Sequence, residues 1–199
     1  MQRLDAEQDD QSIADAAKNF NRLEHVLLQN RTLTLFGEIN QDVARRMAEK
    51  LLALAFESDD PITLYIGSPG GHVESGDTIF DLIRYIKPEV RIIGTGWVGS
   101  IATHIYLAAD KDNRFALPNT RFLIHQPSGG FGGDAADIEI HAREILKTRE
   151  RINGIIAERT GQSIDRVGED TQRDYWMSAE ESVEYGLVGK IISDISEVG

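Results

Sequence analysis

Ile62-Thr-Leu-Tyr-Ile-Gly-Ser-Pro-Gly-Gly71 is the stretch of sequence that decides the fold. Its first half is a short apolar run typical of a buried strand, and the Ser-Pro-Gly-Gly segment ends that strand. Apolar residues then recur at helical spacing up to Ile86, and Pro88 ends the pattern. The stretch therefore predicts one strand followed by one helix.

The same strand-then-helix unit recurs along the chain. The predicted strands are 33–36, 62–66, 90–93 and 122–124, and the predicted helices are 41–56, 79–86, 101–109 and a long helix between Asp134 and Gly161. The glycine-rich segment 94–99 predicts a turn after the third strand. Repeated units of this kind predict an α/β domain with a mostly parallel sheet, in which ligands gather beyond the carboxyl ends of the strands.

The chain divides into a short arm and one domain. Residues 1–18 are acidic, rich in Gln and poor in large apolar side chains, so they predict a mobile N-terminal arm. No second change of composition follows, and residues 19–199 are predicted to form a single domain. The long helix is strongly charged over 144–151 and is the element expected to protrude.

Composition excludes several classes of function. A net charge of -12 disfavours binding to nucleic acid and to anionic membranes. The chain contains no Cys, which excludes disulfides, thiolate metal sites and a cysteine nucleophile. Neither a secretory signal nor an apolar run long enough to span a bilayer is found, so we expect a cytoplasmic protein with no membrane partner.

Ser100 is the candidate nucleophile. It follows a strand and a glycine-rich segment and opens an apolar helix, where helix N–H groups favour developing negative charge. Serine is also a preferred helix N-cap, and the local context alone favours that structural interpretation.

A serine hydroxyl needs a neighbouring base to attack at neutral pH. Among the five histidines, His125 ends a strand at the edge where Ser100 is expected, which places it modestly ahead. His104 lies one turn after Ser100 on the same helix, but a histidine on a buried helix is more often a packing residue. The other three histidines have ordinary surface explanations.

Local sequence arguments do not assign the orienting acid or the oxyanion hole. Asp165, Asp170 and Asp174 all follow the long helix, and local reasoning does not choose which of them orients a histidine. Gly70 and Gly71 form either a plain turn or a backbone edge whose N–H joins that of Ile101 in binding an oxyanion.

Beyond these local arguments, the chain resembles the Clp protease proteolytic subunit (ClpP) family over about residues 33–192. Four ordered blocks carry the resemblance: Tyr65 to Gly71 with Gly76 and Ile79; Gly96 to Ser100; Arg114 to Arg121 with Ile124 to Pro127; and Arg173-Asp174 with Met177 to Ala179 and Glu184 to Val188. Together these blocks are a strong signal.

The resemblance implies roles for particular residues. It implies a serine endopeptidase with Ser100 as nucleophile, His125 as general base and Asp174 as the orienting acid. The backbone N–H groups of Gly71 and Ile101 would form the oxyanion hole. The segment Ser128, Gly129, Gly130 and Phe131 would align an extended substrate by main-chain pairing. No metal or other cofactor is implied, and ATP would be used by a separate unfoldase.

The resemblance also implies an architecture and partners. The fold would be the spiral of βα units that this family shares with crotonases, with the long helix as a protruding handle. Subunits would form a homo-oligomer of two stacked heptameric rings that enclose a chamber, and an AAA+ unfoldase would feed it unfolded proteins. Gln172 stands where an acid is usual beside Arg173, which weakens an expected charge pair between the rings.

Two other functions compete with the peptidase. One is a crotonase-type enzyme acting on coenzyme A thioesters, which the blocks around Ser100, His125 and Asp174 argue against. The other is an inactive ring subunit that only supports assembly, which the presence of all three residues makes less favoured.

Overall fold

The computed structural model describes residues 22–128, 130 and 132–198, so the predicted arm over residues 1–18 lies outside the described residues. Residues 22–29 are helical. The later elements are β1 (Thr32–Phe36), α2 (Gln41–Glu57), β2 (Ile62–Ser68), α3 (Val73–Tyr85), β3 (Val90–Gly99), α4 (Ile101–Tyr106), β4 (Arg114–Ala116), β5 (Arg121–Ile124), α5 (Ala135–Thr160), α6 (Ile164–Asp170), β6 (Tyr175–Met177), α7 (Ala179–Tyr185) and β7 (Lys190–Ile191). Short 3₁₀ turns cover Lys111–Asn113 and Ile195–Val198.

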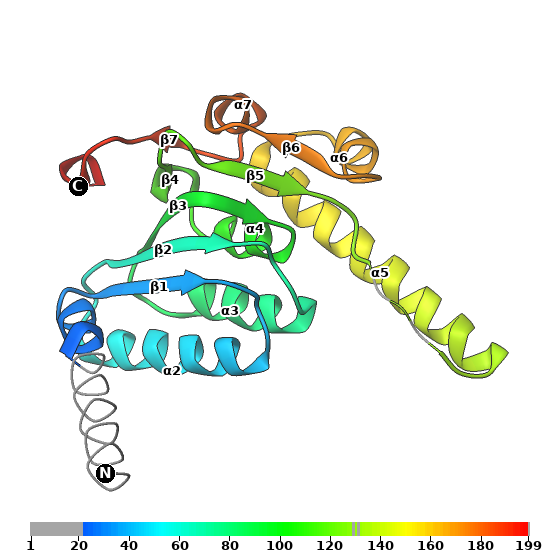
Figure 1. The fold of residues 1–199 in the computed structure, drawn as a ribbon, viewed down its shortest axis with the longest axis horizontal. Coiled ribbons are helices and arrows are strands. Elements are labelled where there is room, and N and C mark those ends of the chain that lie inside the picture. The colour runs from blue at the N-terminus through cyan, green and yellow to red at the C-terminus, as the bar shows by residue number, and fades with distance from the viewer. Residues whose placement is uncertain (1–21, 129, 131, 199) are drawn as a thin grey trace, which may run out of the picture.

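A mostly parallel sheet forms the centre of the molecule (Figure 1). Its main path runs β1-β2-β3-β4-β7 with parallel pairing throughout, while β5 pairs in parallel with β3 and antiparallel with β6. This arrangement confirms the predicted α/β class and the predicted βα units.

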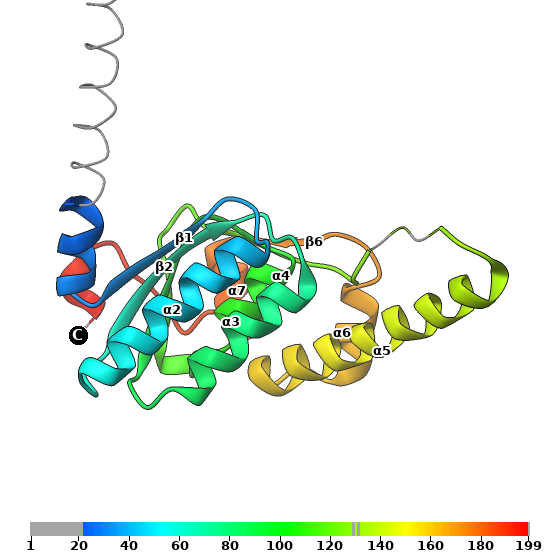
Figure 2. The ribbon, with the colours of Figure 1, turned by 90° about the horizontal axis from the view of Figure 1, so that it is seen from below.

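One side of the sheet packs against helices α2, α3 and α4 (Figure 2). The alternation along β1 and β2 directs Leu33, Leu35, Leu64 and Ile66 into this interface, where each is at most 2% exposed. Burying these branched side chains between sheet and helices supplies the main stabilisation of the body.

The segment 94–99 is strand, and the prediction of a turn there is wrong. Strand β3 continues to Gly99 because it changes partner: Ile92 to Gly94 pair with β4, and Trp97 to Gly99 pair with β5. Two glycines make this change of partner strand possible. Gly96 has φ +61, and a Cβ on Gly94 would lie 3.0 Å from the Phe122 ring. Ser100, which follows the last residue of β3, therefore lies at the edge of the sheet where β5 also ends.

Helix α5 projects from the body as a long arm (Figures 1 and 2). As predicted, Asp134 caps its start by accepting from the Asp137 N–H, and Gly161, with φ 79, ends it. Its buried residues, Ile152, Asn153 and Ile156, lie in the second half, so the first half extends into solvent. No helix among the residues described here is long and apolar enough to cross a membrane.

The predicted substrate-aligning strand falls partly outside the described residues, which exclude Gly129 and Phe131. Ser128 and Gly130 are exposed and belong to no strand. Strand geometry requires a hydrogen-bonded neighbour, and the described part of this chain provides none beside them. An aligning role for this segment stays a prediction.

Candidate active site

Ser100 lies at the junction of β3 and α4 in an unusual backbone conformation. Its φ of 56° and ψ of -127° are rare for a residue with a side chain and cost of order 1–3 kcal/mol. Its N–H donates to the carbonyl of Leu123 on β5 at 2.9 Å, which helps to hold this turn. The hydroxyl makes no capping bond to α4, so Ser100 occupies the N-cap position without the N-cap function.

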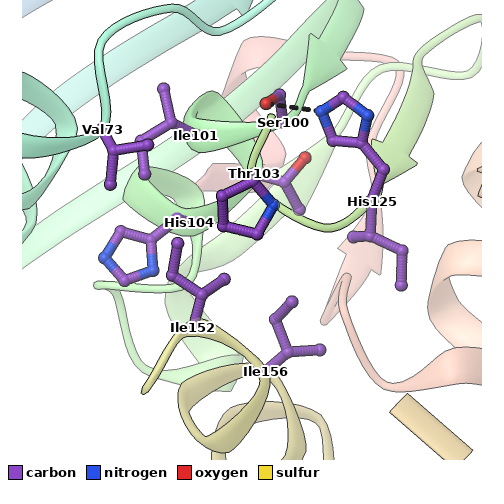
Figure 3. A pocket seen from close by; sticks show the side chains of 10 residues that line it. Val73, Ser100, Ile101, Thr103, His104, His125, Ile152 and Ile156 are labelled. Atoms are coloured by element: carbon purple, nitrogen blue, oxygen red, sulfur yellow. Dashed lines mark hydrogen bonds between the residues drawn. The ribbon is translucent and has the colours of Figure 1, made fainter. Parts of the chain in front are cut away.

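His125 follows β5 and faces Ser100 (Figure 3). Its Nε2 lies 2.8 Å from Oγ of Ser100, and its Nδ1 lies 3.0 Å from Oδ1 of Asp174. An ionised carboxylate only accepts hydrogen bonds, so the arrangement requires Nδ1–H to donate to Asp174 and Nε2 to accept from the Ser100 hydroxyl. The three predicted residues thus form a continuous hydrogen-bonded relay.

Strand pairing explains why residues far apart along the chain meet here. Gly99 pairs with Leu123, so Ser100 and His125 leave adjacent parallel strands at the same edge. Strand β6 runs antiparallel to β5 with Ile124 opposite Tyr175, so Asp174 arrives beside His125 from the other direction. The side chain of Asp174 is 63% exposed and that of His125 26% exposed, so the relay opens toward solvent.

His104 and Asp170 have other neighbours, and Asp165 is exposed on another element. His104 is 2% exposed, stacks on Phe80 with ring centroids 4.3 Å apart, and lies near Asp77. Asp170 accepts a hydrogen bond from the Tyr185 hydroxyl at 2.9 Å, and Asp165 is exposed in the first turn of α6. The structure thus leaves His125 as the partner of Ser100, and Asp174 as the partner of His125.

The turn at Gly70 and Gly71 packs directly against Ser100. A Cβ on Gly70 would lie 2.7 Å from Cβ of Ser100 and 3.1 Å from the Ile101 nitrogen. A Cβ on Gly71, whose φ is +148, would lie 2.2 Å from the carbonyl oxygen of Ile39. Only glycine allows this approach, which brings the backbone of the turn next to the amide of Ile101.

An apolar pocket opens beside Ser100 (Figure 3). Its wall combines Ser100 and His125 with side chains from three helices and β5, among them Val73, Ile101, Ile124, Ile152 and Ile156. Sequence reasoning did not identify this pocket. The available signal was the spacing of Ile152 and Ile156 on one face of the long helix, and only the packing of α5 against α4 turns that face into a pocket wall.

The fold and the site together define a serine-type peptidase. The chain belongs to the Clp protease family, whose model matches residues 15–194. This assignment confirms the resemblance seen in the sequence and favours a peptidase over a crotonase-type enzyme.

Named relatives and solved structures agree with this family. The chain is 54% identical to the ATP-dependent Clp protease proteolytic subunit 3 of Rhizobium meliloti (strain 1021), with 86% of this chain and 88% of the relative covered. It is 51% identical to proteolytic subunit 2 of Pseudomonas aeruginosa, with 89% and 88% covered. A mutant of ClpP1 from Listeria monocytogenes superposes with a TM-score of 0.84 at 51% identity, covering 89% of this chain and 99% of that one.

Proposed function

We propose that the chain is a proteolytic subunit of an ATP-dependent Clp protease and hydrolyses peptide bonds with Ser100 as nucleophile, His125 as general base and Asp174 as the orienting acid. The observation that carries this proposal is the relay from Ser100 Oγ through His125 to Asp174, with contacts of 2.8 and 3.0 Å. An aligned relay also argues against a subunit that serves assembly alone.

The proposed reaction is acyl transfer in two halves. His125 Nε2 takes the Ser100 proton as Oγ bonds to the substrate carbonyl carbon, and Asp174 stabilises the resulting imidazolium. The imidazolium then protonates the leaving amine as the C–N bond breaks. In the second half, His125 deprotonates a water that attacks the acyl-enzyme, and Ser100 regains its proton. The mechanism uses no metal or other cofactor.

The oxyanion that forms in each half needs hydrogen-bond donors. We assign this role to the backbone N–H groups of Gly71 and Ile101, because the glycine turn packs against Ser100 and the Ile101 nitrogen. Neither N–H has an acceptor within the described part of the chain. The apolar lining of the pocket would contact the substrate side chain on the acyl side, which favours apolar residues there.

Gly71→Ala is expected to reduce kcat for peptide hydrolysis by about 10²-fold. The new methyl group collides with the Ile39 carbonyl, so the turn must move and carry its N–H away from the oxyanion. Initial rates with a fluorogenic peptide measure the effect. Gly168→Ala is the matched control, because nothing lies within 4 Å of a Cβ there. A Gly71→Ala enzyme with unchanged kcat would contradict the assignment.

The assembly and partners are proposed from the resemblance. Subunits would stack as two seven-membered rings around a chamber, and an AAA+ unfoldase of the Clp type would deliver unfolded protein. Two surfaces suit contacts between copies: the protruding helix α5, with Ile138, Ile140 and Leu146 exposed, and the helical residues Leu23, Val26 and Leu27, which are also exposed. A cytoplasmic location, and the absence of nucleic-acid and membrane partners, stay predictions.

A purified wild-type preparation is expected to cleave short fluorogenic peptides without ATP and to spare a folded protein. Peptides reach an enclosed site by diffusion, whereas a folded chain must first be unfolded. Adding a Clp-type unfoldase with ATP should then start degradation of the folded substrate, measured as loss of its fluorescence. Absence of peptide cleavage by the assembled protein would count against the proposed function.

A further inference from the structure

The carboxylate of Asp77 connects three helices beside the candidate active site. Asp77 lies on α3 and accepts two hydrogen bonds from Arg151 of α5, at 2.8 and 2.7 Å. Its Oδ1 also lies 3.2 Å from Nε2 of His104 on α4. Bidentate arginine–carboxylate pairs fix orientation as well as distance, so this contact sets how α5 meets α3.

The Asp77 carboxylate is the charged group that lies beside the buried ring of His104. The ring is 2% exposed, and neither of its nitrogens makes an aligned hydrogen bond with the described residues. The nearby charge of Asp77 therefore compensates a buried polar ring that stacks on Phe80. Burial raises the pKa of Asp77, but its contacts with His104 and Arg151 outweigh burial and lower that pKa to about 2, so the carboxylate stays charged at neutral pH.

Both partners of Asp77 belong to the wall of the apolar pocket or lie next to it. His104 lines the pocket one helical turn after Ser100 (Figure 3). Arg151 immediately precedes Ile152, which lines the same pocket together with Ile156. The half of α5 before Arg151 is largely exposed, so the pair with Asp77 anchors α5 where it reaches the body.

We propose that Asp77 is a positioning residue for substrate selection: it holds His104 and the Arg151 end of α5 together, and thereby keeps the apolar wall beside Ser100 in position to contact an apolar substrate side chain. This inference rests on the proposed peptidase function and deepens it. The relay of Ser100, His125 and Asp174 makes no contact with Asp77 in the described structure. A change at Asp77 should therefore alter the preference between substrates without altering the reactivity of Ser100.

The test compares two fluorogenic peptides that differ only in leucine or alanine before the scissile bond. In the full assembled protein, Asp77→Asn keeps the size of the side chain and removes its charge. We expect the ratio of kcat/KM for leucine over alanine to fall about tenfold, because a displaced pocket wall loses the contacts that distinguish side chains of different size. The rate at which a small fluorophosphonate labels Ser100 should stay within about twofold, since it needs the relay and not the pocket.

Controls separate selection from general damage. Asp81→Asn removes the same charge one turn further along α3, from an exposed side chain. Its charge acts on Arg151 through space, without a hydrogen bond between the described side chains, so this change should leave the ratio within about twofold. Asp77→Glu, which keeps the carboxylate, should recover part of the ratio. If Asp77→Asn fails to assemble, Arg151→Gln replaces it in the test, because the side chain of Arg151 is 45% exposed. This variant must show the same fall in the ratio of kcat/KM for leucine over alanine.

Several outcomes would overturn the inference. An unchanged ratio in Asp77→Asn or Arg151→Gln would do so, as would equal losses for both peptides together with slower labelling of Ser100, which indicate a purely structural role. A fall of the same size in Asp81→Asn would show a general effect of charge. If the wild-type protein neither labels at Ser100 nor cleaves either peptide, the proposed function itself is wrong, and this inference falls with it.

Discussion

Ser100→Ala is expected to lower kcat for peptide hydrolysis by about 10⁴-fold or more and to abolish labelling by a fluorophosphonate. Without Oγ, His125 has no hydroxyl to deprotonate and no acyl-enzyme can form. Folding should be little affected, because alanine must adopt the same φ of 56° as serine, and the backbone bond to Leu123 remains. Peptide cleavage, mass analysis of the labelled protein and thermal unfolding measure these effects together.

A matched control addresses the reactivity of serine in general. Ser193→Ala removes the hydroxyl of an exposed residue near the C-terminus and should leave labelling and kcat within about twofold. Labelling that persists at another serine in Ser100→Ala, with peptide cleavage retained, would show that a different residue is the nucleophile.

The elements that the sequence predicts well are those with local signals. Apolar runs between glycine and proline breaks located β1, β2 and β5, and the capping pattern at Asp134 and Gly161 located both ends of α5. The turn predicted over 94–99 failed for a physical reason. Glycine usually breaks a strand, but here pairing with two successive partners outweighs the local preference and β3 continues.

The sequence predicted the site only as far as it predicted where the strands end. Because parallel strands finish at one edge, Ser100 and His125 could be expected near each other without coordinates. The choice of Asp174 over Asp165 and Asp170 depends on the antiparallel pairing of β5 with β6, which nothing in the local sequence encodes. The resemblance to Clp proteases supplied that choice.

The contacts among Asp77, His104 and Arg151 could not be predicted from the sequence for the same reason. Asp77, His104 and Arg151 come from three helices, and none of them stands in a recognisable motif. Only packing of α3, α4 and α5 shows that a single carboxylate serves both a buried imidazole and an arginine.

Asp174→Asn is expected to lower kcat by about 10³-fold, with little change in stability. An amide in place of the carboxylate can donate to Nδ1, which favours the tautomer with the proton on Nε2, where the Ser100 proton must go. The loss should be smaller than for Ser100→Ala because the side chain of Asp174 is 63% exposed, and water screens part of its charge. Asp165→Asn makes the same change on an exposed acid of α6 and should keep kcat within about twofold, measured on the same peptide. Near-normal turnover in Asp174→Asn, or a large loss in Asp165→Asn, would identify a different orienting acid, and the assignment of the relay would have to change.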